Sequence, residues 1–84
     1  MLYKGSVVCS LSGHDKGRMY LVVKIDGDFA YVVDGKFRLK DNPKKKRIKH
    51  LKDTFTKYKD SDKIDNLYDY EIATYLKNID NLHN

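Results

Sequence analysis

The residues best suited to chemistry in this sequence are basic, and they gather in two places. The first is a turn over residues 13–18, where two glycines flank or separate four polar or charged side chains. The second is a block over residues 36–52, which holds nine basic residues against one acid and so has a local charge of +8. A charge of this size suits a polyanionic partner, and phosphate backbones are the commonest one.

Basic side chains in both places are therefore the candidate binding residues. In the 13–18 turn, a plain hairpin would explain the glycines but does not require the basic residues, which can contact phosphates. A solvated face or a localisation signal is the alternative reading of the block, in which Arg can form forked phosphate contacts and Lys acts as a point charge. The candidates are His14, Lys16, Arg18, Lys36, Arg38, Lys40, Lys44, Lys45, Lys46, Arg47 and Lys49.

Catalytic, metal and cofactor sites find no support in the sequence. Cys9 is the single cysteine, and its alternating apolar neighbours predict a buried packing role. The three histidines have no ligand-like spacing, and residues 13–17 lack the spacing of a phosphate-binding loop. A chain of 84 residues also has little room for a deep cleft. We expect no catalytic residue, no metal ligand, no cofactor and no enzymatic activity.

The hydrophobic pattern predicts five short strands. Alternating or β-branched runs place them at residues 6–11, 19–25, 29–33, 36–40 and about 47–51. Asp34-Gly35 between two such runs predicts a type I′ hairpin turn, with Phe37 and Leu39 pointing inward on the following strand. Five strands in so short a segment favour a small, strongly bent barrel over residues 1–52.

The chain changes character after the barrel. Residues 53–68 are polar and charged, which predicts a linker or a loosely docked segment. Residues 69–81 have apolar side chains at helical spacing, with Ile72, Leu76 and Ile79 in one stripe and Asp69 as the expected N-cap. A helix of this length is unstable alone, so we expect it to dock on the barrel or on a partner.

Aromatic residues of the barrel have two possible roles. Phe29 and Phe37 are expected in the core. Tyr20 and Tyr31 lie opposite apolar neighbours on their strands, and either packing in the core or stacking on unpaired bases remains open for them.

Composition also carries expectations about location. The longest apolar runs are far shorter than the roughly 20 residues that cross a bilayer. The N-terminus lacks the apolar stretch of a signal peptide, and one cysteine suits a reducing compartment. We expect a cytoplasmic protein with no membrane partner, and a monomer.

The N-terminal part of the chain resembles a KOW domain, an SH3-like barrel found in ribosomal proteins and in elongation factors of the NusG type. The resemblance rests on a strand, a tight glycine-containing loop and a second strand over residues 5–25, with the family's signature glycine at Gly17. Val32-Val33-Asp34-Gly35 and Lys49-His50-Leu51 are similar to the KOW domain of an archaeal and eukaryotic large-subunit ribosomal protein and its small bacterial relatives. Those relatives end in a brief helix, which Glu71-Ile72 and Leu76 match weakly.

The resemblance implies a mostly β fold, a small five-stranded SH3-like (KOW) barrel with a short C-terminal α-helix. It also implies a role in binding structured RNA, with ribosomal RNA or the ribosome as the expected partner, and an association with translation. RNA would be read by shape more than by sequence. The alternative is a protein-interaction module that uses the barrel and the helix. On the RNA reading, changing residues 44–47 to Glu should abolish binding without unfolding the barrel.

Overall fold

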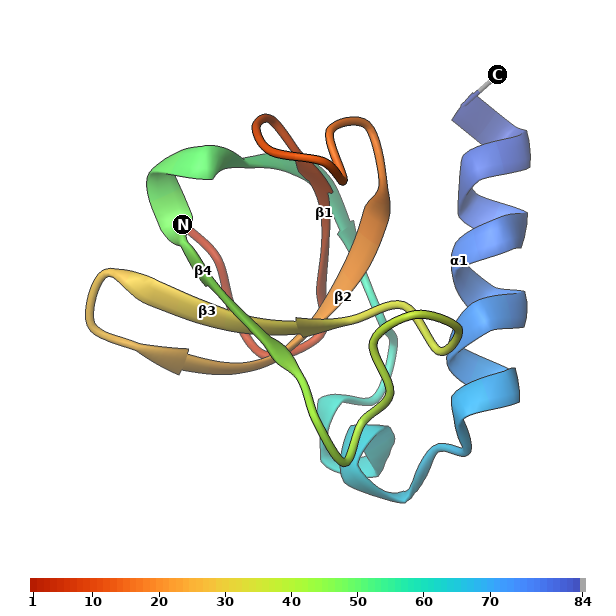
Figure 1. Ribbon diagram of the computed structural model, residues 1–84. Coiled ribbons are helices and arrows are strands. Elements are labelled where there is room, and N and C mark those ends of the chain that lie inside the picture. The colour runs from red at the N-terminus through yellow and green to blue at the C-terminus, as the bar shows by residue number, and fades with distance from the viewer. Residues whose placement is uncertain (84) are drawn as a thin grey trace.

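The computed structural model describes the backbone of residues 1–83 and the side chains of residues 1–82. Its elements are β1 (Ser6–Ser10), β2 (Met19–Asp26), β3 (Phe29–Val33), β4 (Lys44–Arg47), the 3-10 helix η1 (Ile48–His50), β5 (Leu51–Lys57), the 3-10 helix η2 (Ser61–Asn66) and α1 (Asp69–His83) (Figure 1). None of the helices in this described part of the chain is long and apolar enough to cross a membrane.

The five strands form one antiparallel sheet in the order β4-β3-β2-β1-β5. The first four strands of that order are neighbours along the chain, and β5 returns to pair with β1 on its other side. The sheet curls strongly without closing, and α1 stands against its outside (Figure 1). The predicted fold class is therefore confirmed: a small, mostly β, barrel-like domain with one C-terminal helix.

Both faces of the sheet are buried, which explains why Val7 and Val8 are adjacent in β1 and both fully buried. Val8, Tyr20 and Val22 pack inside the curl of the sheet with the apolar residues of β3. On the outside, Val7, Leu21 and Val33 pack against η2 and α1. Neither cluster alone would give so small a chain a sufficient core.

The helix docks on the barrel, which is one of the two arrangements expected from the sequence. Ile72 and Leu76 are buried in the outer cluster, and Ile79 packs at its margin. Asp69, however, does not cap the helix as predicted. The Glu71 carboxylate accepts from the backbone N–H of Tyr68 at 3.0 Å, while the Asp69 carboxylate accepts from the backbone N–H of Lys40 at 2.9 Å.

The predicted fourth strand at residues 36–40 is wrong, because this segment is a loop. Instead of a type I′ hairpin, one carboxylate oxygen of Asp34 accepts from three successive backbone N–H groups, those of Lys36 (3.0 Å), Phe37 (2.9 Å) and Arg38 (2.8 Å). These bonds wrap the chain around the carboxylate and prevent an extended strand. Phe37 and Leu39, expected inward, are exposed, Phe37 by 72%.

The last part of the barrel also differs from the prediction. Residues 48–50 form η1, and the final strand is β5, which extends to Lys57. Most of the expected linker at 53–68 is therefore structured, since β5 is followed by η2 with its buried Ile64. A bulge interrupts β5 opposite Val7 and Val8, and there Phe55 has a φ of +64° and an 87% exposed side chain.

Two smaller expectations about side chains also change. Cys9 is half-buried rather than buried. Phe29, expected in the core, is half-exposed on the outer face of β3. Tyr20, left open by the sequence, is fully buried inside the curl, and Tyr31 lies half-exposed on the outside.

Candidate nucleic-acid interface

The alternation of side chains along β4 divides its four basic residues into two groups. Lys44 and Lys46 pair with Val32 and Ala30 of β3, whereas Lys45 and Arg47 pair with Tyr31 and Phe29. Because successive side chains of a strand point to opposite faces, the first pair points toward the end of the barrel and the second points to solvent. Lys46 is only 8% exposed.

The inward pair meets Asp15, a buried carboxylate in the middle of the 13–18 turn. The Lys44 and Lys46 ammonium groups each lie 3.0 Å from it. The Tyr20 hydroxyl donates to the same carboxylate at 2.6 Å and the Ser10 hydroxyl at 2.9 Å. Lys46 uses its other donors on the Ser10 hydroxyl (2.6 Å) and the Ser12 carbonyl (3.3 Å). Every member of this network is thus hydrogen-bonded.

The network shifts the acidity of two of its groups. Burial by itself would raise the pKa of Asp15, but the hydrogen bonds from Tyr20, Lys46, Lys44 and Ser10 outweigh it and hold that pKa well below its usual range. Burial, together with the hydrogen bond to the Asp15 carboxylate, raises the pKa of Tyr20 to about 12. Asp15 is therefore a carboxylate at every physiological pH, and it fixes the 13–18 turn to β4.

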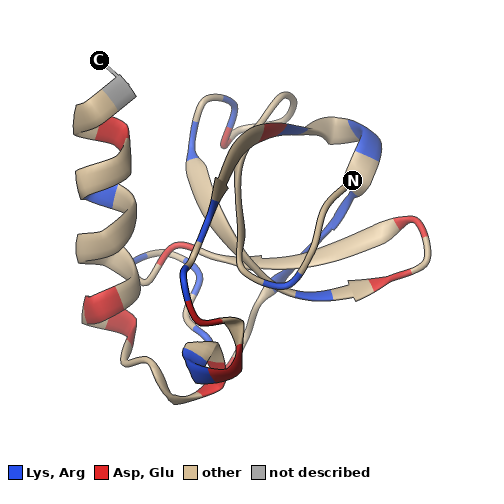
Figure 2. Cartoon of the chain, turned by 180° about the vertical axis from the view of Figure 1, so that it is seen from behind, with Lys and Arg blue, Asp and Glu red and all other residues tan. Residues whose placement is uncertain are grey.

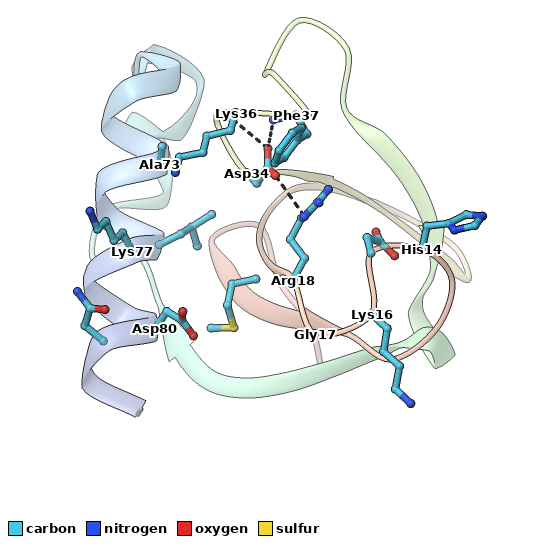
Figure 3. A pocket seen from close by; sticks show the side chains of 14 residues that line it. His14, Lys16, Gly17, Arg18, Asp34, Lys36, Phe37, Ala73, Lys77 and Asp80 are labelled. Atoms are coloured by element: carbon cyan, nitrogen blue, oxygen red, sulfur yellow. Dashed lines mark hydrogen bonds and ion pairs between the residues drawn. The ribbon is translucent and has the colours of Figure 1, made fainter.

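The 13–18 turn consequently has a defined shape. Its ends are joined by backbone bonds from Ser10 N–H to the Arg18 carbonyl and from Gly17 N–H to the Ser10 carbonyl, both 2.9 Å. Gly17 has a φ of +90°, a conformation that suits glycine. His14 and Lys16 are exposed on this turn, and they point away from the helix (Figure 3).

The outward pair of β4 residues lies over an aromatic ring. The Lys45 ammonium is 4.4 Å from the centre of the Phe29 ring and the Arg47 guanidinium 5.0 Å from it. On the neighbouring strand the Lys24 ammonium lies 5.5 Å from the Tyr31 ring. We call these five residues, Lys24, Phe29, Tyr31, Lys45 and Arg47, the β4 face.

A second basic region borders a groove between the barrel and the helix. Arg18 reaches from the 13–18 turn to Phe37, with its guanidinium 4.4 Å from the centre of the ring, and its Nε lies 3.9 Å from the Asp34 carboxylate (Figure 3). The basic lining also includes His14 and Lys16 of the turn, Lys36, and Lys77 on α1.

The remaining predicted residues take different positions. Arg38 is half-buried and uses its carbonyl to accept from the N–H groups of Asp34 and Gly35. Lys40 extends its ammonium to the Asp65 carbonyl at 3.3 Å, and Lys49 is exposed on η1. The predicted residues therefore do not form one surface. Lys44 and Lys46 turn inward, and Lys45 and Arg47 belong to the β4 face. The groove is lined by the other turn and loop residues of the prediction, His14, Lys16, Arg18 and Lys36.

The predicted binding residues lacked several members of these sites, among them Asp15, Lys24, Phe29, Phe37 and Lys77. Asp15 gave a usable signal, since a single acid among the basic residues of a tight turn is a candidate partner for a buried cation. Phe29 and Lys24 would follow once strands β2, β3 and β4 are aligned in register. No signal in the sequence pointed to Lys77, because only the docking of α1 on the barrel brings it to the groove.

Charge is unevenly distributed over the molecule. Acidic residues mark both ends of α1 and the turn between β2 and β3, while β4 carries four consecutive basic residues (Figure 2). Within the described residues, no group of three or more His, Cys, Asp or Glu side chains is placed to hold a metal ion.

The fold and its surface thus define a class of protein: a small barrel-like domain with a cationic face backed by aromatic rings and a basic groove beside its helix. No protein-family model matches the chain, and no curated protein matches it significantly.

Proposed function

We propose that this protein binds structured RNA through the β4 face, in association with the ribosome or translation. The observation that carries the proposal is the placement of Lys45 and Arg47, which point outward from an edge strand with their charged groups held over the Phe29 ring. Both charged groups lie over the ring, and both side chains remain exposed, so their charges are available to a ligand from the solvent side.

Such an arrangement suits phosphates for two reasons. Cations held over a ring lose less side-chain entropy on binding than freely rotating ones, and Arg47 can in addition bind a phosphate in forked geometry. The exposed Lys49 on η1 and Lys24 on β2 extend the charge beyond the central pair. Since A-form RNA hides its base edges in a narrow groove, phosphate contacts of this kind read shape.

The KOW resemblance of the 13–18 turn and its flanking strands supports RNA as the polyanion, and a monomeric, cytoplasmic protein is part of the same proposal. The barrel-like sheet with its N-terminal β-turn-β unit is compatible with that resemblance.

The test is a charge reversal restricted to the outward residues, K45E/R47E. Changing all of Lys44–Arg47 would not test binding alone, because Lys44 and Lys46 pair with Asp15 and their loss would destabilise the fold. We expect K45E/R47E to weaken binding to an RNA hairpin roughly tenfold or more. The slope of log K against log salt should fall by about 2, one for each lost phosphate contact. Filter binding or fluorescence anisotropy at several salt concentrations measures both.

The matched control is K59E/K63E, which makes the same change of charge on exposed lysines near η2. It should retain most of the affinity. Equal weakening in the two variants would mean that only net charge matters and that the β4 face is no site. Unchanged binding in K45E/R47E, or a purified protein that binds no RNA but elutes with a protein partner, would reject RNA binding by this face.

A further inference from the structure

The groove between the barrel and α1 has the size of a small-ligand site. Its volume is about 550 Å³, within the range of about 300–1,000 Å³ in which such ligands are usually bound. Three segments form it: the 13–18 turn, the loop over residues 34–38 and one side of α1 (Figure 3). Met19, Ala73 and Leu76 belong to its apolar lining, together with Phe37, and the other lining residues are mostly polar or charged.

Phe37 is presented at this groove by a loop with a fixed backbone. The three N–H bonds to Asp34 define the loop, and its backbone also packs closely on the helix at Gly35, where a Cβ would collide with Asp69 and Ala73 of α1. Yet the Phe37 ring is 72% exposed and contributes little to the core. Arg18 is held on the ring and against Asp34. A rigid loop therefore holds an aromatic ring out to solvent beside a cation.

The free charge of the groove is positive. Asp15 is engaged by Lys44 and Lys46, and Asp34 by three N–H groups and Arg18. Within residues 1–82, Lys36 and Lys77 are exposed and form no ion pair. Asp80 is the remaining acid, on the helix side, where its carboxylate can accept from an amino group.

We propose that this groove binds one unpaired nucleotide, with its base stacked on Phe37 and its phosphate beside Lys36 and Lys77. An exposed ring offers a base a stacking surface, and lysines that line the same groove offer its phosphate a counter-charge. The proposal deepens the proposed function and rests on it for the RNA source. A nucleotide unpaired within an RNA and a free mononucleotide share this chemistry, and the experiment separates them.

The two sites can serve one RNA. Phe29 begins β3 and Asp34 follows its end, so the β4 face and the groove lie at opposite ends of a five-residue strand that spans roughly 16 Å. A stem held at the β4 face would leave a neighbouring bulged nucleotide within reach of Phe37. The preferred ligand is then a stem that carries an unpaired nucleotide, rather than an uninterrupted duplex.

The experiment compares two RNA hairpins that differ by a single-nucleotide bulge, measured by fluorescence anisotropy. The wild-type protein should bind the bulged RNA about five- to a hundredfold more tightly, the usual effect of stacking one base on an aromatic side chain. Phe37→Ala should remove this preference and leave the affinity for the unbulged RNA unchanged. Phe37→Tyr, which keeps the ring, should retain the preference.

The matched control is Phe55→Ala, the same substitution at a more exposed phenylalanine on β5; it should retain the preference. Equal affinity of the wild type for both RNAs, or a preference that survives in Phe37→Ala, would overturn the proposal. K45E/R47E should weaken binding to both RNAs equally. If the β4 face does not bind RNA, K45E/R47E will leave the affinity for the unbulged RNA unchanged. If the groove does not bind the bulged nucleotide, the ratio of the two affinities will be close to one or will not change in Phe37→Ala.

Competition with AMP identifies the source of the nucleotide. Displacement of the bulged RNA only at millimolar AMP assigns the groove to a nucleotide within RNA. Displacement at micromolar AMP, together with loss of AMP binding in Phe37→Ala, assigns it to a free mononucleotide. AMP binding that Phe37→Ala leaves intact would place the nucleotide elsewhere and reject the groove.

Discussion

Asp15 is the acid that fixes the positions of two basic side chains of β4, those of Lys44 and Lys46. Its carboxylate is 5% exposed and accepts from four side chains, two of them lysines. A buried charge is costly unless it is paired and hydrogen-bonded. Asp15 is the only ion-pair partner of Lys46 among the described residues, so removing Asp15 leaves the buried Lys46 ammonium without a counter-charge, whereas removing Lys46 leaves Asp15 paired with Lys44.

We predict that Asp15→Asn lowers the free energy of unfolding by about 3 kcal/mol at neutral pH, because it leaves the Lys46 ammonium buried without a counter-charge. Since the folded-state pKa of Asp15 lies below its unfolded value of about 4, its contribution is complete above that value and is lost as the pH falls. Stability of the wild type should therefore decline below about pH 5, and Asp15→Asn should decline less. Urea denaturation at a series of pH values measures both.

The control for this substitution is Asp26→Asn at an exposed position near the end of β2. It should change stability by less than about 0.5 kcal/mol. A pH profile of Asp15→Asn parallel to that of the wild type would show that the acid sensitivity arises from other groups.

At the scale of elements, the sequence predicts the position of a strand or helix well where its apolar residues are the ones that the fold buries. Strands β1, β2 and β3 lie within a few residues of their predicted bounds, and apolar residues on both of their faces are buried. The helix also lies close to its predicted bounds, because its apolar stripe packs on the sheet. Residues 36–40 alternate equally well, but the Asp34 carboxylate binds three N–H groups and bends the chain into a loop. Strand β5 escaped prediction because its polar sequence and its bulge at Phe55 give no regular pattern.

Gly35 is the point where a loop and the helix meet. It has a φ of +77°, and a Cβ there would lie 2.7 Å from the backbone nitrogen of Ala73 and would also collide with the Asp69 carbonyl. Gly35→Ala should cost about 3 kcal/mol or more, because neither strain nor backbone overlap can relax without moving α1. Gly27→Ala is the matched control, since Gly27 also has a positive φ but open space around it; it should cost about 1 kcal/mol. If guanidinium denaturation gives the same loss of unfolding free energy for both variants, α1 can move away from residue 35 without a measurable penalty.

At the scale of the whole molecule, the helix is part of the core rather than an appendage. It covers the outer face of the sheet, and the inner face is filled by the barrel's own residues. The sequence predicted the basic character of the surface and the docked stripe of the helix. It did not predict the division into a β4 face and a groove, since this division depends on the register of β4 and on the helix crossing beside Phe37.

Two leucines of α1 test this view. Leu76 is 4% exposed in the outer cluster, whereas Leu82 is 81% exposed near the end of the helix. Leu76→Ala should lower the free energy of unfolding by about 2–4 kcal/mol through lost burial and a cavity. Leu82→Ala should change it by less than about 0.5 kcal/mol. Similar small effects of both in thermal denaturation would mean that the barrel is stable without its helix.

The open sheet has one more consequence, which concerns encounters between copies of the chain. An unclosed sheet ends in two strand edges, here on β4 and β5, and bare edges invite pairing with other molecules. At β5 the bulge around Phe55 breaks the regular row of backbone donors and acceptors. At β4 the two outward cations, Lys45 and Arg47, oppose the approach of a second β4 strand. The side chains that we propose for RNA binding thus also disfavour pairing of two copies of the chain through this edge, and an RNA bound to them would cover the same edge.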